Sequence, residues 1–356
     1  MFERRLQEVR KYLETSGLDA LLVSHLPHVR YLTGFSGSNG LSVITLRKQF
    51  FFTDKRYREQ SKNEVDGFEI TVTSDTLLKA ARKRGVLNGR KKIGFECEYL
   101  SVSMFENLKK LFPSASFVAK RSVIETIAAV KEESEIETIK QAAAITDKVF
   151  KKALLVLEPG VRELEIAAEI SYWHLRMGAE GDAFESIVAS GPRGALPHGR
   201  ATEKRIRKGE FVTLDFGCKY KGYNSDLTRT VAVGKPTERA KRIYRTVLEA
   251  QRKAIEAVRP GVPAQALDKV ARNHIRQKGF GKYFSHSLGH GLGIEIHEPL
   301  RLSVKSKDVV KQGNVFTIEP GIYIQGFGGV RIEDDVVVRD SGCEVITHSP
   351  KELMIL

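Results

Sequence analysis

The chain has few cysteines, and no stretch of it stays apolar for long. Its three cysteines, Cys97, Cys218 and Cys343, are widely separated and form no CxxC pair. This spacing argues against a disulfide framework or a thiolate zinc site, and it favours a reducing compartment, so we expect a cytoplasmic protein. No apolar run approaches the ~20 residues that a membrane-spanning helix needs. Residues 1–17 read as a charged amphipathic helix rather than a signal peptide, and we therefore expect no membrane partner.

Several common catalytic motifs are also absent. The chain has no P-loop lysine motif, no GxSxG nucleophile elbow and no HExxH zinc-protease helix. Residues 25–40, HLPHVRYLTGFSGSNG, are rich in glycine and aromatic side chains. This segment fits two interpretations equally, a connecting loop or a lid or interface segment.

The excess of positive charge raises nucleic acid as a candidate partner. Lys and Arg number 58 against 44 Asp and Glu, which gives a net charge of +14. The densest basic run is RKRGVLNGRKK, at residues 82–92, but acidic residues are interspersed through most of the rest and no RNA- or DNA-binding signature is present. We interpret the run as a solvated face and do not expect nucleic acid as a partner.

At 356 residues the chain is long for a single domain, and its predicted elements divide it in two. Strand-like segments such as DALLVS (19–24) and LSVITL (41–46) alternate with helical segments, which predicts a compact α/β unit with a mixed sheet. A charged segment then leads into one long amphipathic helix at 131–157. We predict domains at residues 1–125 and 126–356.

The second domain contains an internal duplication. GEFVTLDFG, at residues 209–217, matches GNVFTIEPG, at residues 313–321, and a PGV sequence lies upstream of each copy. Each copy is predicted to run from a helix into strands that carry two acids. The acids are Asp215 and Asp226 in the first copy and Glu319 and Glu333 in the second.

Two copies that face each other would bring these four acids to one place. Four carboxylates share a buried site only if cations neutralise them, and oxygen ligands suit hard divalent ions such as Mn²⁺. The segment HSLGHGLGIEIHEP adds His286, His290 and His297, and an earlier Gly/Pro loop ends at His198. One such histidine is most often structural, but three so close together beside predicted metal ligands indicate binding or catalysis.

Taken in order, Asp215, Asp226, His290, Glu319 and Glu333 resemble the five metal ligands of the pita-bread metallopeptidases, which include methionine aminopeptidase, aminopeptidase P and prolidase. The resemblance extends to DFGCKYKGYNSDLTRT, HSLGHGLGIEIHE, TIEPGIY and VRIEDDVVV, and it covers the whole chain. It implies an α/β fold in which a pita-bread catalytic domain with an internal pseudo-twofold duplication follows a smaller α/β domain. That first domain resembles the N-terminal domain of the proline-specific members and of creatinase.

The resemblance also implies roles for individual residues. Two divalent metal ions per subunit are expected, with Mn favoured over Co or Zn, and with Asp226 and Glu333 shared between the ions. Arg331 would hold either a ligand carboxylate or the carboxylate of the substrate. The residues expected to be catalytic are Glu319, His198 and His297, and those expected to bind substrate are His198, His286, His297 and Arg331.

Together these features predict an Xaa-Pro peptidase acting on proline-containing peptides. Methionine aminopeptidases usually lack the N-terminal domain, and creatinase lacks the metal ligands. The segment YLTGFSGSNG (31–40) resembles aminopeptidase P, which cuts Xaa-Pro from longer peptides, whereas the short chain resembles prolidases, which cut the dipeptide. Arg301 is the candidate cation for a free C-terminal carboxylate, and the choice stays open. The resemblance further implies a homodimer.

The alternative function is a metal-free pita-bread module that binds protein or nucleic acid. Members of that kind typically lose one or more of the five ligand positions, whereas this chain keeps all five. A creatinase-type amidinohydrolase is disfavoured because that chemistry has no use for an intact metal set. The sequence therefore favours the peptidase.

Overall fold

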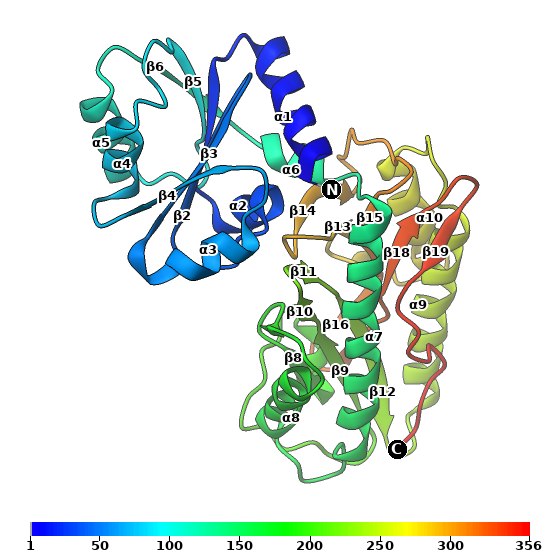
Figure 1. The fold of residues 1–356 in the computed structure, drawn as a ribbon. Helices are drawn as coiled ribbons and strands as arrows, with labels where there is room; N and C mark the ends of the chain where they lie inside the picture. Colours follow the sequence, from blue (N-terminus) through cyan, green and yellow to red (C-terminus); the bar gives the residue numbers. More distant parts are fainter. Residues whose placement is uncertain (1) are drawn as a thin grey trace. The chain divides into compact units, whose positions relative to one another are not determined.

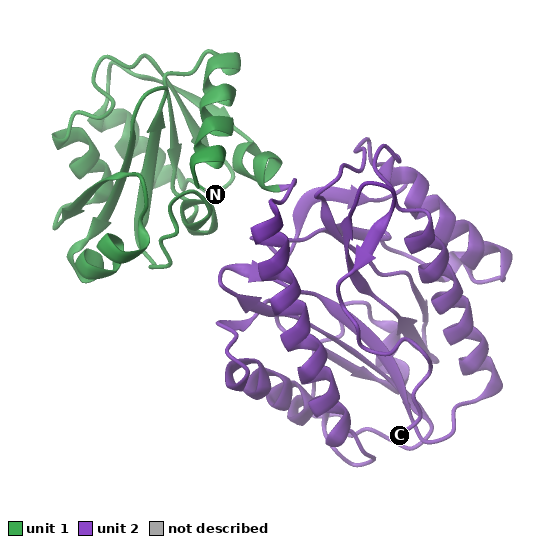
Figure 2. Ribbon diagram, turned by 45° about the vertical axis from the view of Figure 1, so that its right-hand side comes forward, with its two compact units in different colours: residues 1–128 green, residues 129–356 purple. Residues whose placement is uncertain are grey.

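The chain folds as two compact units. The structure is a computed structural model that describes residues 2–356. A boundary between Ala128 and Ala129 separates the units (Figure 2). The predicted boundary, between residues 125 and 126, falls inside helix α6 (Val123–Ala128), which belongs to the first unit.

The first unit is a mixed sheet flanked by helices (Figure 1). Its strand order is β4-β3-β2-β1-β5-β6. Within this sheet β2 runs antiparallel to both neighbours, and the remaining pairs are parallel. The elements before α6 are α1 (Phe2–Ser16), β1 (Ala20–Val23), α2 (Leu26–Thr33), β2 (Gly40–Thr45), β3 (Gln49–Asp54), η1 (Lys55–Tyr57), α3 (Arg58–Glu64), β4 (Glu69–Thr73), α4 (Leu77–Lys83), β5 (Lys92–Glu96), α5 (Val102–Leu111) and β6 (Ser116–Lys120).

The segment at residues 25–40, for which a connecting loop was one of two interpretations, contains a helix. Residues 26–33 form α2, so the connecting-loop interpretation of residues 25–40 is wrong for half of that segment. A proline in the first turn suits a helix N-terminus, and Gly34, with φ of 84°, ends the helix in the left-handed conformation. The sequence reasoning gave too much weight to the glycines that follow the helix.

The second unit contains two copies of one arrangement, a pair of helices packed on a sheet. In its first half α7 and α8 pack on the sheet β12-β9-β8, and in its second half α9 and α10 pack on the sheet β14-β13-β15-β18-β19. The predicted α/β fold with its internal duplication is thereby confirmed. The elements are α7 (Glu133–Leu155), α8 (Glu163–Arg176), β7 (Gly181–Asp182), β8 (Ile187–Ser190), η2 (Gly191–Ala195), β9 (Glu210–Phe216), β10 (Cys218–Tyr220), β11 (Tyr223–Asn224), β12 (Leu227–Val233), α9 (Glu238–Glu256), α10 (Ala264–Gln277), η3 (Gly281–Tyr283), β13 (Gly289–Gly291), β14 (Glu298–Leu302), β15 (Val315–Ile318), β16 (Gly321–Ile324), β17 (Gly328–Arg331), β18 (Asp334–Val338) and β19 (Cys343–Val345).

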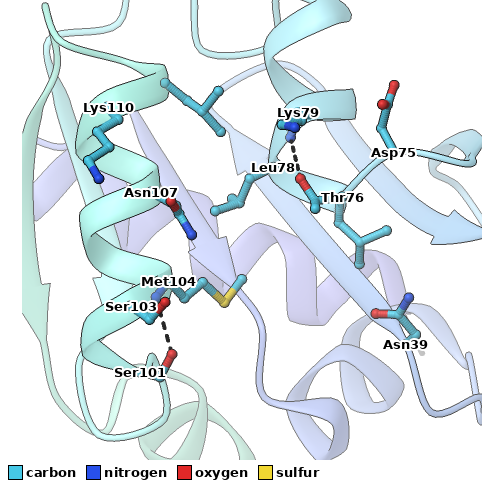
Figure 3. Close-up of a pocket in the computed structure, with 12 residues that line it drawn as sticks. Asn39, Asp75, Thr76, Leu78, Lys79, Ser101, Ser103, Met104, Asn107 and Lys110 are labelled. Carbon is cyan, nitrogen blue, oxygen red and sulfur yellow. Dashed lines mark hydrogen bonds between the residues drawn. The ribbon is translucent and has the colours of Figure 1, made fainter.

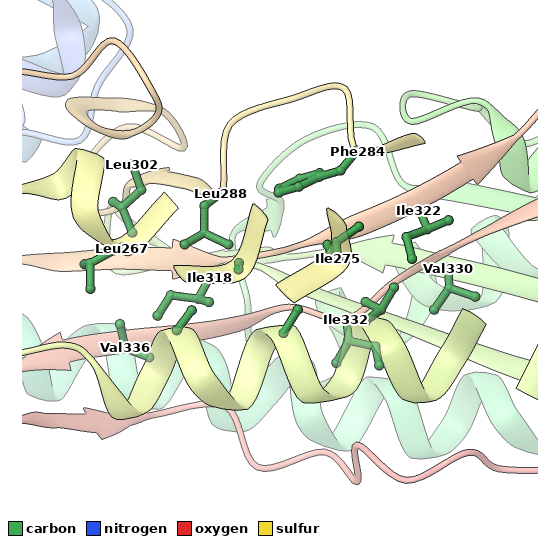
Figure 4. Packing of buried hydrophobic residues seen from close by; sticks show 14 of the residues in the cluster. Leu267, Ile275, Phe284, Leu288, Leu302, Ile318, Ile322, Val330, Ile332 and Val336 are labelled. Carbon is green, nitrogen blue, oxygen red and sulfur yellow. The ribbon is translucent and has the colours of Figure 1, made fainter. Parts of the chain in front are cut away.

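The apolar core of the second half fixes where its strands end. From α10, Leu267 and Ile275 face the sheet and pack with Leu288, Ile318 and Val336, all of them buried (Figure 4). Full burial of an aliphatic side chain contributes ~1.5–3 kcal/mol. Because this cluster holds β15 and β18 in place, the polar residues next to these strands are held in place as well.

The last residues of the chain pair with β12. Backbone hydrogen bonds join Ala232 to the tail at 2.9 Å in both directions. Arg229, fully buried in β12, donates to the carbonyls of Ser349 at 2.7 Å and Pro350 at 3.0 Å, and also to the carbonyl of Glu333. The tail is therefore bonded to the strand that immediately follows Asp226, a predicted ligand. Among the helices of residues 2–356, none is both long and apolar enough to cross a bilayer.

Candidate active site

The two duplicated hairpins carry the four predicted acids at matching places. Asp215 lies in β9 opposite Thr228 of β12, and Asp226 immediately precedes β12. In the second hairpin Glu319 immediately follows β15, and Glu333 immediately precedes β18. Each hairpin thus presents one acid from each of its two strands.

Two glycines allow the backbone to pack closely beside these acids. A Cβ added at Gly217 would lie 1.8 Å from the carbonyl oxygen of Ser225, which precedes Asp226. A Cβ added at Gly289 would lie 1.9 Å from the carbonyl oxygen of Thr317. Since real Cβ atoms never come so near a carbonyl, both positions require glycine.

Four of the predicted ligands meet in one cavity of about 290 Å³. Asp226, His290 and Glu333 bring their ligand atoms within 4.8 Å of one another. His290 Nε2 lies 3.5 Å from Glu319 Oε1 and 3.7 Å from Asp226 Oδ2. These distances are long for hydrogen bonds. They suit atoms that each bind the same ion at about 2.0–2.2 Å.

Burial and mutual repulsion raise the pKa values of the acids. Burial, followed by the charge of Glu333, raises the pKa of Asp226 well above its usual value. Burial, followed by the charges of Glu319 and Asp215, does the same to the pKa of Glu333. Burial raises the pKa of Glu319 to about 8. In the described chain Asp226 Oδ1 is buried with no hydrogen-bond partner, so the group is short of positive charge.

His290 turns one nitrogen toward the acids. Its Nδ1 lies 3.1 Å from the carbonyl oxygen of Gly291, so Nδ1 carries the proton and Nε2 keeps a lone pair. Burial lowers the pKa of His290 to about 3. The ring is therefore neutral near pH 7 and able to bind a metal ion.

The fifth predicted ligand, Asp215, does not line the cavity, but Arg331, which does, binds its carboxylate. Its Nη2 donates to Asp215 Oδ2, and its Nε donates to the hydroxyl of Thr228 at 3.0 Å. Its Nη1 donates to the carbonyl of Pro197 at 3.1 Å and to the hydroxyl of Tyr323 at 2.8 Å. Four of the five guanidinium N–H groups are thus used within the protein. These contacts favour the first of the two predicted roles, in which Arg331 holds a ligand carboxylate.

His286 forms part of the cavity wall. Its Nδ1 lies 2.8 Å from the carbonyl oxygen of Ser287, and its Nε2 lies 2.8 Å from the hydroxyl of Tyr323. Burial lowers the pKa of His286 to about 4. Both nitrogens are occupied, so the neutral ring offers the cavity its apolar faces, as a lining residue would.

His198, His297 and Arg301 line the same cavity. The rings of His297 and His290 are in edge-to-face contact, with centroids 4.3 Å apart. Burial and the nearby charge of Arg301 lower the pKa of His297. Arg301 pairs with His290 across β13 and β14, so both side chains lie on the same face. No residue between 2 and 356 forms an ion pair with the Arg301 guanidinium.

A larger cavity, of about 630 Å³, lies in the first unit between α4 and α5 (Figure 3). Leucine, methionine, hydroxyl and amide side chains form most of its lining, together with Lys79 and Lys110. Its one acid, Asp75, is paired with Lys83 at 2.6 Å, and no histidine lines it. One paired carboxylate and two lysines make no group of metal ligands, so the smaller cavity is the candidate active site.

Three residues that organise this site were missed by the sequence analysis. The hydroxyl of Thr228 donates to Glu333 Oε2 at 2.5 Å, and the hydroxyl of Thr317 donates to Glu319 Oε1 at 3.2 Å. The third, Tyr323, bridges Arg331 and His286. Two of them stand two positions from a predicted ligand, Thr228 after Asp226 and Thr317 before Glu319. That spacing puts side chains on one face of a strand and could have indicated them.

Buried carboxylates that repel one another require cations, and the histidines that line the same cavity can act on a bound substrate. This combination defines a metal-dependent hydrolase. Comparison with known proteins agrees, because residues 137–340 match metallopeptidase family M24 and residues 5–130 match the creatinase/prolidase N-terminal domain. The chain belongs to metallopeptidase family M24. Its second unit has the predicted pita-bread fold, and its first unit is creatinase-like.

Relatives of known structure resemble the chain over its full length. The Xaa-Pro dipeptidase from Bacillus anthracis is 42% identical, with a TM-score of 0.97 and 100% of both chains covered. An X-Pro aminopeptidase from Thermotoga maritima is 38% identical, with a TM-score of 0.91 and coverage of 96% of this chain and 98% of the other. The Xaa-Pro dipeptidase of Pyrococcus furiosus is 40% identical over 99% of this chain and 100% of its own.

Proposed function

We propose that this protein is a metal-dependent Xaa-Pro dipeptidase. The class of reaction is supported by full-length similarity to Xaa-Pro dipeptidases and an X-Pro aminopeptidase. That similarity supports the peptidase and gives no support to the alternative, a metal-free binding module. Because relatives of both kinds match at comparable identity, the choice between dipeptidase and aminopeptidase depends on this chain's own cavity.

One observation carries the choice of a dipeptide. Arg301 reaches the cavity as a cation without an ion-pair partner among the described residues, on the same face as His290. In an Xaa-Pro dipeptide the proline carries a free carboxylate one residue beyond the bond to be cut, whereas in a longer peptide that position is a neutral amide. A guanidinium binds a carboxylate with two parallel hydrogen bonds, so Arg301 favours the dipeptide.

Asp215, Asp226, His290, Glu319 and Glu333 would hold two divalent ions, with Mn²⁺ the proposed metal. When bound, such ions polarise the carbonyl of the substrate and make a water molecule nucleophilic near neutral pH. The unpartnered oxygen of Asp226 and the raised pKa values of the acids support this assignment. The contact from Arg331 keeps the Asp215 carboxylate turned toward the cluster.

Glu319 is the proposed proton carrier. Burial raises its pKa to about 8 in the metal-free chain, and the hydroxyl of Thr317 donates to its Oε1 at 3.2 Å, which orients the carboxylate. The proline nitrogen of the substrate is part of a tertiary amide without an N–H, so it must gain a proton in order to leave. His198 and His297 line the cavity and would stabilise the oxygen that gains negative charge.

Hydrolysis of three peptide types by the Mn²⁺-loaded protein tests the proposal. Cleavage of Xaa-Pro, with little or none of Xaa-Pro-Yaa or Xaa-Ala, is the expected result. Efficient cleavage of Xaa-Pro-Yaa would instead make the protein an aminopeptidase. Arg301→Ala should raise KM for Xaa-Pro, because it removes the cation that would bind the free carboxylate of the dipeptide. Arg301→Lys, which keeps the charge, should raise KM less.

The oligomeric state and the location are two separate proposals. We propose a homodimer from the family resemblance, and light scattering coupled to gel filtration tests it. We propose a cytoplasmic location because Cys97, Cys218 and Cys343 are all free thiols. Cell fractionation tests the location.

A further inference from the structure

A buried ion pair lies directly behind His297. Lys131, near the start of the second unit, donates from Nζ to Glu298 Oε2, and the two side chains are only 1% and 2% exposed. Glu298 follows His297 in the chain. The backbone N–H of Lys131 donates to the carbonyl of Gly313 at 2.9 Å, which anchors Lys131 beside β15. Neither member of the pair has a part in the chemistry proposed above.

The ion pair contacts the loop at residues 292–297, here called the His297 loop. The second oxygen of Glu298, Oε1, accepts a hydrogen bond from the Ile294 N–H at 3.1 Å, so the carboxylate closes the loop on itself. Gly293 packs against both partners, because an added Cβ would lie 2.3 Å from Glu298 Oε1 and 2.8 Å from Lys131 Cε. One carboxylate thus joins the loop backbone to a fixed ammonium group.

The imidazole ring of His297 makes few contacts of its own. Its ring makes no hydrogen bond within the part of the chain that the structure describes, and its ring contact there is the edge-to-face contact with His290. The course of the loop backbone must therefore set where the ring stands. Asn224 adds a second fixed point, donating to the carbonyls of Gly293 at 3.0 Å and Ile294 at 3.2 Å.

We propose that Lys131 is a positioning residue that acts through Glu298 to fix the His297 imidazole at the cavity. A buried ion pair adds little stability compared with apolar side chains of the same size. Its two charge-assisted hydrogen bonds do restrict geometry, since they are satisfied in one arrangement of the loop. This inference rests on the proposed function, because it gives His297 a place in substrate turnover.

Histidine NMR on the metal-free protein tests the position directly. The full chain is labelled with ¹⁵N-histidine, and the His297 signal is assigned with His297→Ala. Lys131→Met should shift or broaden the His297 signal and leave that of His174, which is buried in α8 and paired with Asp182, unchanged. The control is Lys140→Met, which removes a half-exposed pair with Glu344 on the surface of the same unit and should leave His297 unchanged. An unmoved His297 signal in Lys131→Met would overturn the proposal.

Kinetics separate positioning from simple loss of structure. Lys131→Met should lower kcat/KM about tenfold or more in the wild-type background, and less than about twofold in the His297→Ala background, since coupled residues are non-additive. Metal content should stay equal in all variants. Equal losses in both backgrounds would overturn the proposal.

A substitute variant and a separate readout allow the experiments to contradict the proposal in every case. Lys131→Met alone leaves the buried Glu298 carboxylate without a cation beside it. If that variant does not fold, the double variant Lys131→Met/Glu298→Gln, in which both side chains are neutral, replaces it. The expected change in the His297 signal is the same. If no variant, wild type included, cleaves Xaa-Pro, the proposed function fails while the NMR experiment still decides whether Lys131 positions His297.

Discussion

Arg331, at the end of β17, donates a hydrogen bond to Asp215 in β9, so an ion pair joins the two halves of the duplicated unit. Both side chains are buried. The guanidinium therefore does more than balance charge. It selects one orientation of a carboxylate that the other acids would repel.

Loss of this guanidinium should weaken metal binding. We expect Arg331→Met to lower metal affinity and activity about 10- to 100-fold, the usual effect of removing a group that orients a ligand. Arg331→Lys should restore little, because an ammonium cannot serve Asp215, Thr228 and Tyr323 together. Elemental analysis after dialysis measures the metal. The matched control is Arg339→Met, which removes an exposed pair with Glu133, and full metal content in Arg331→Met would contradict the assignment.

His198 and Glu319 should separate catalysis from metal binding. We expect His198→Ala to lower kcat by about 10²-fold with metal content unchanged, because the ring is assigned to the developing charge of the substrate. Glu319→Ala should abolish turnover and reduce metal content as well. If His198→Ala also loses metal, His198 belongs among the ligands.

The metal-free protein should lose stability as pH rises above neutrality. An acid with a raised folded-state pKa stabilises the fold fully below its unfolded-state pKa, and that contribution disappears as pH rises through the folded-state value. For Glu319 this interval runs from 4.5 to about 8. The pKa values of His286 and His290 are lowered from 6.5 to about 4 and about 3. These two histidines therefore make the free energy of unfolding rise with pH, but only below pH 6.5.

The melting temperature of the metal-free protein should therefore fall between about pH 6.5 and about pH 8. Excess Mn²⁺ should remove the decline, because the cations take the place of the protons. Glu319→Gln, which cannot ionise, should make the metal-free decline shallower, and the raised pKa values of Asp226 and Glu333 account for the decline that stays. Differential scanning calorimetry across this range measures the effect, and a flat or rising profile in the metal-free wild type would contradict the account of the acids.

Gly217→Ala should damage the site through the backbone alone. Its added methyl group would meet the carbonyl of Ser225, next to Asp226, at 1.8 Å. We expect a loss of at least ~1–3 kcal/mol of stability together with reduced metal binding. Gly160→Ala is the comparison, since it adds strain at φ of 98° but meets no atom within 4 Å, so it should cost ~1 kcal/mol and leave the metal bound. Urea unfolding and elemental analysis measure both variants.

The parts of the fold and site that the sequence predicted depend on local patterns. The long helix expected at 131–157 is confirmed as α7, because its apolar positions recur along one face. The duplication placed Asp215 and Glu319 in equivalent strands, and the structure brings Asp226, His290, Glu319 and Glu333 to one cavity. Patterns of this kind can be read from the sequence because their residues are near neighbours or members of a repeat.

The parts that the sequence did not predict depend on contacts between distant residues. Arg331 was assigned two possible partners, and only the folded chain shows its contact with Asp215. The bridge from Tyr323 to His286 and the Lys131–Glu298 pair went unnoticed, since no spacing or repeat links the partners. Strand β4, EITVT, is an exception, because its alternating polar and apolar residues could have indicated a half-buried strand.

The hydrogen bonds of Arg229 make the end of the chain a support for the catalytic cavity. If residues 349–356 were removed, this fully buried guanidinium would lose the carbonyls of Ser349 and Pro350 and keep only the partners in and beside the hairpin, such as the carbonyl of Glu333. Residues 349–356 therefore support the wall of the cavity through Arg229, although none of them lines it.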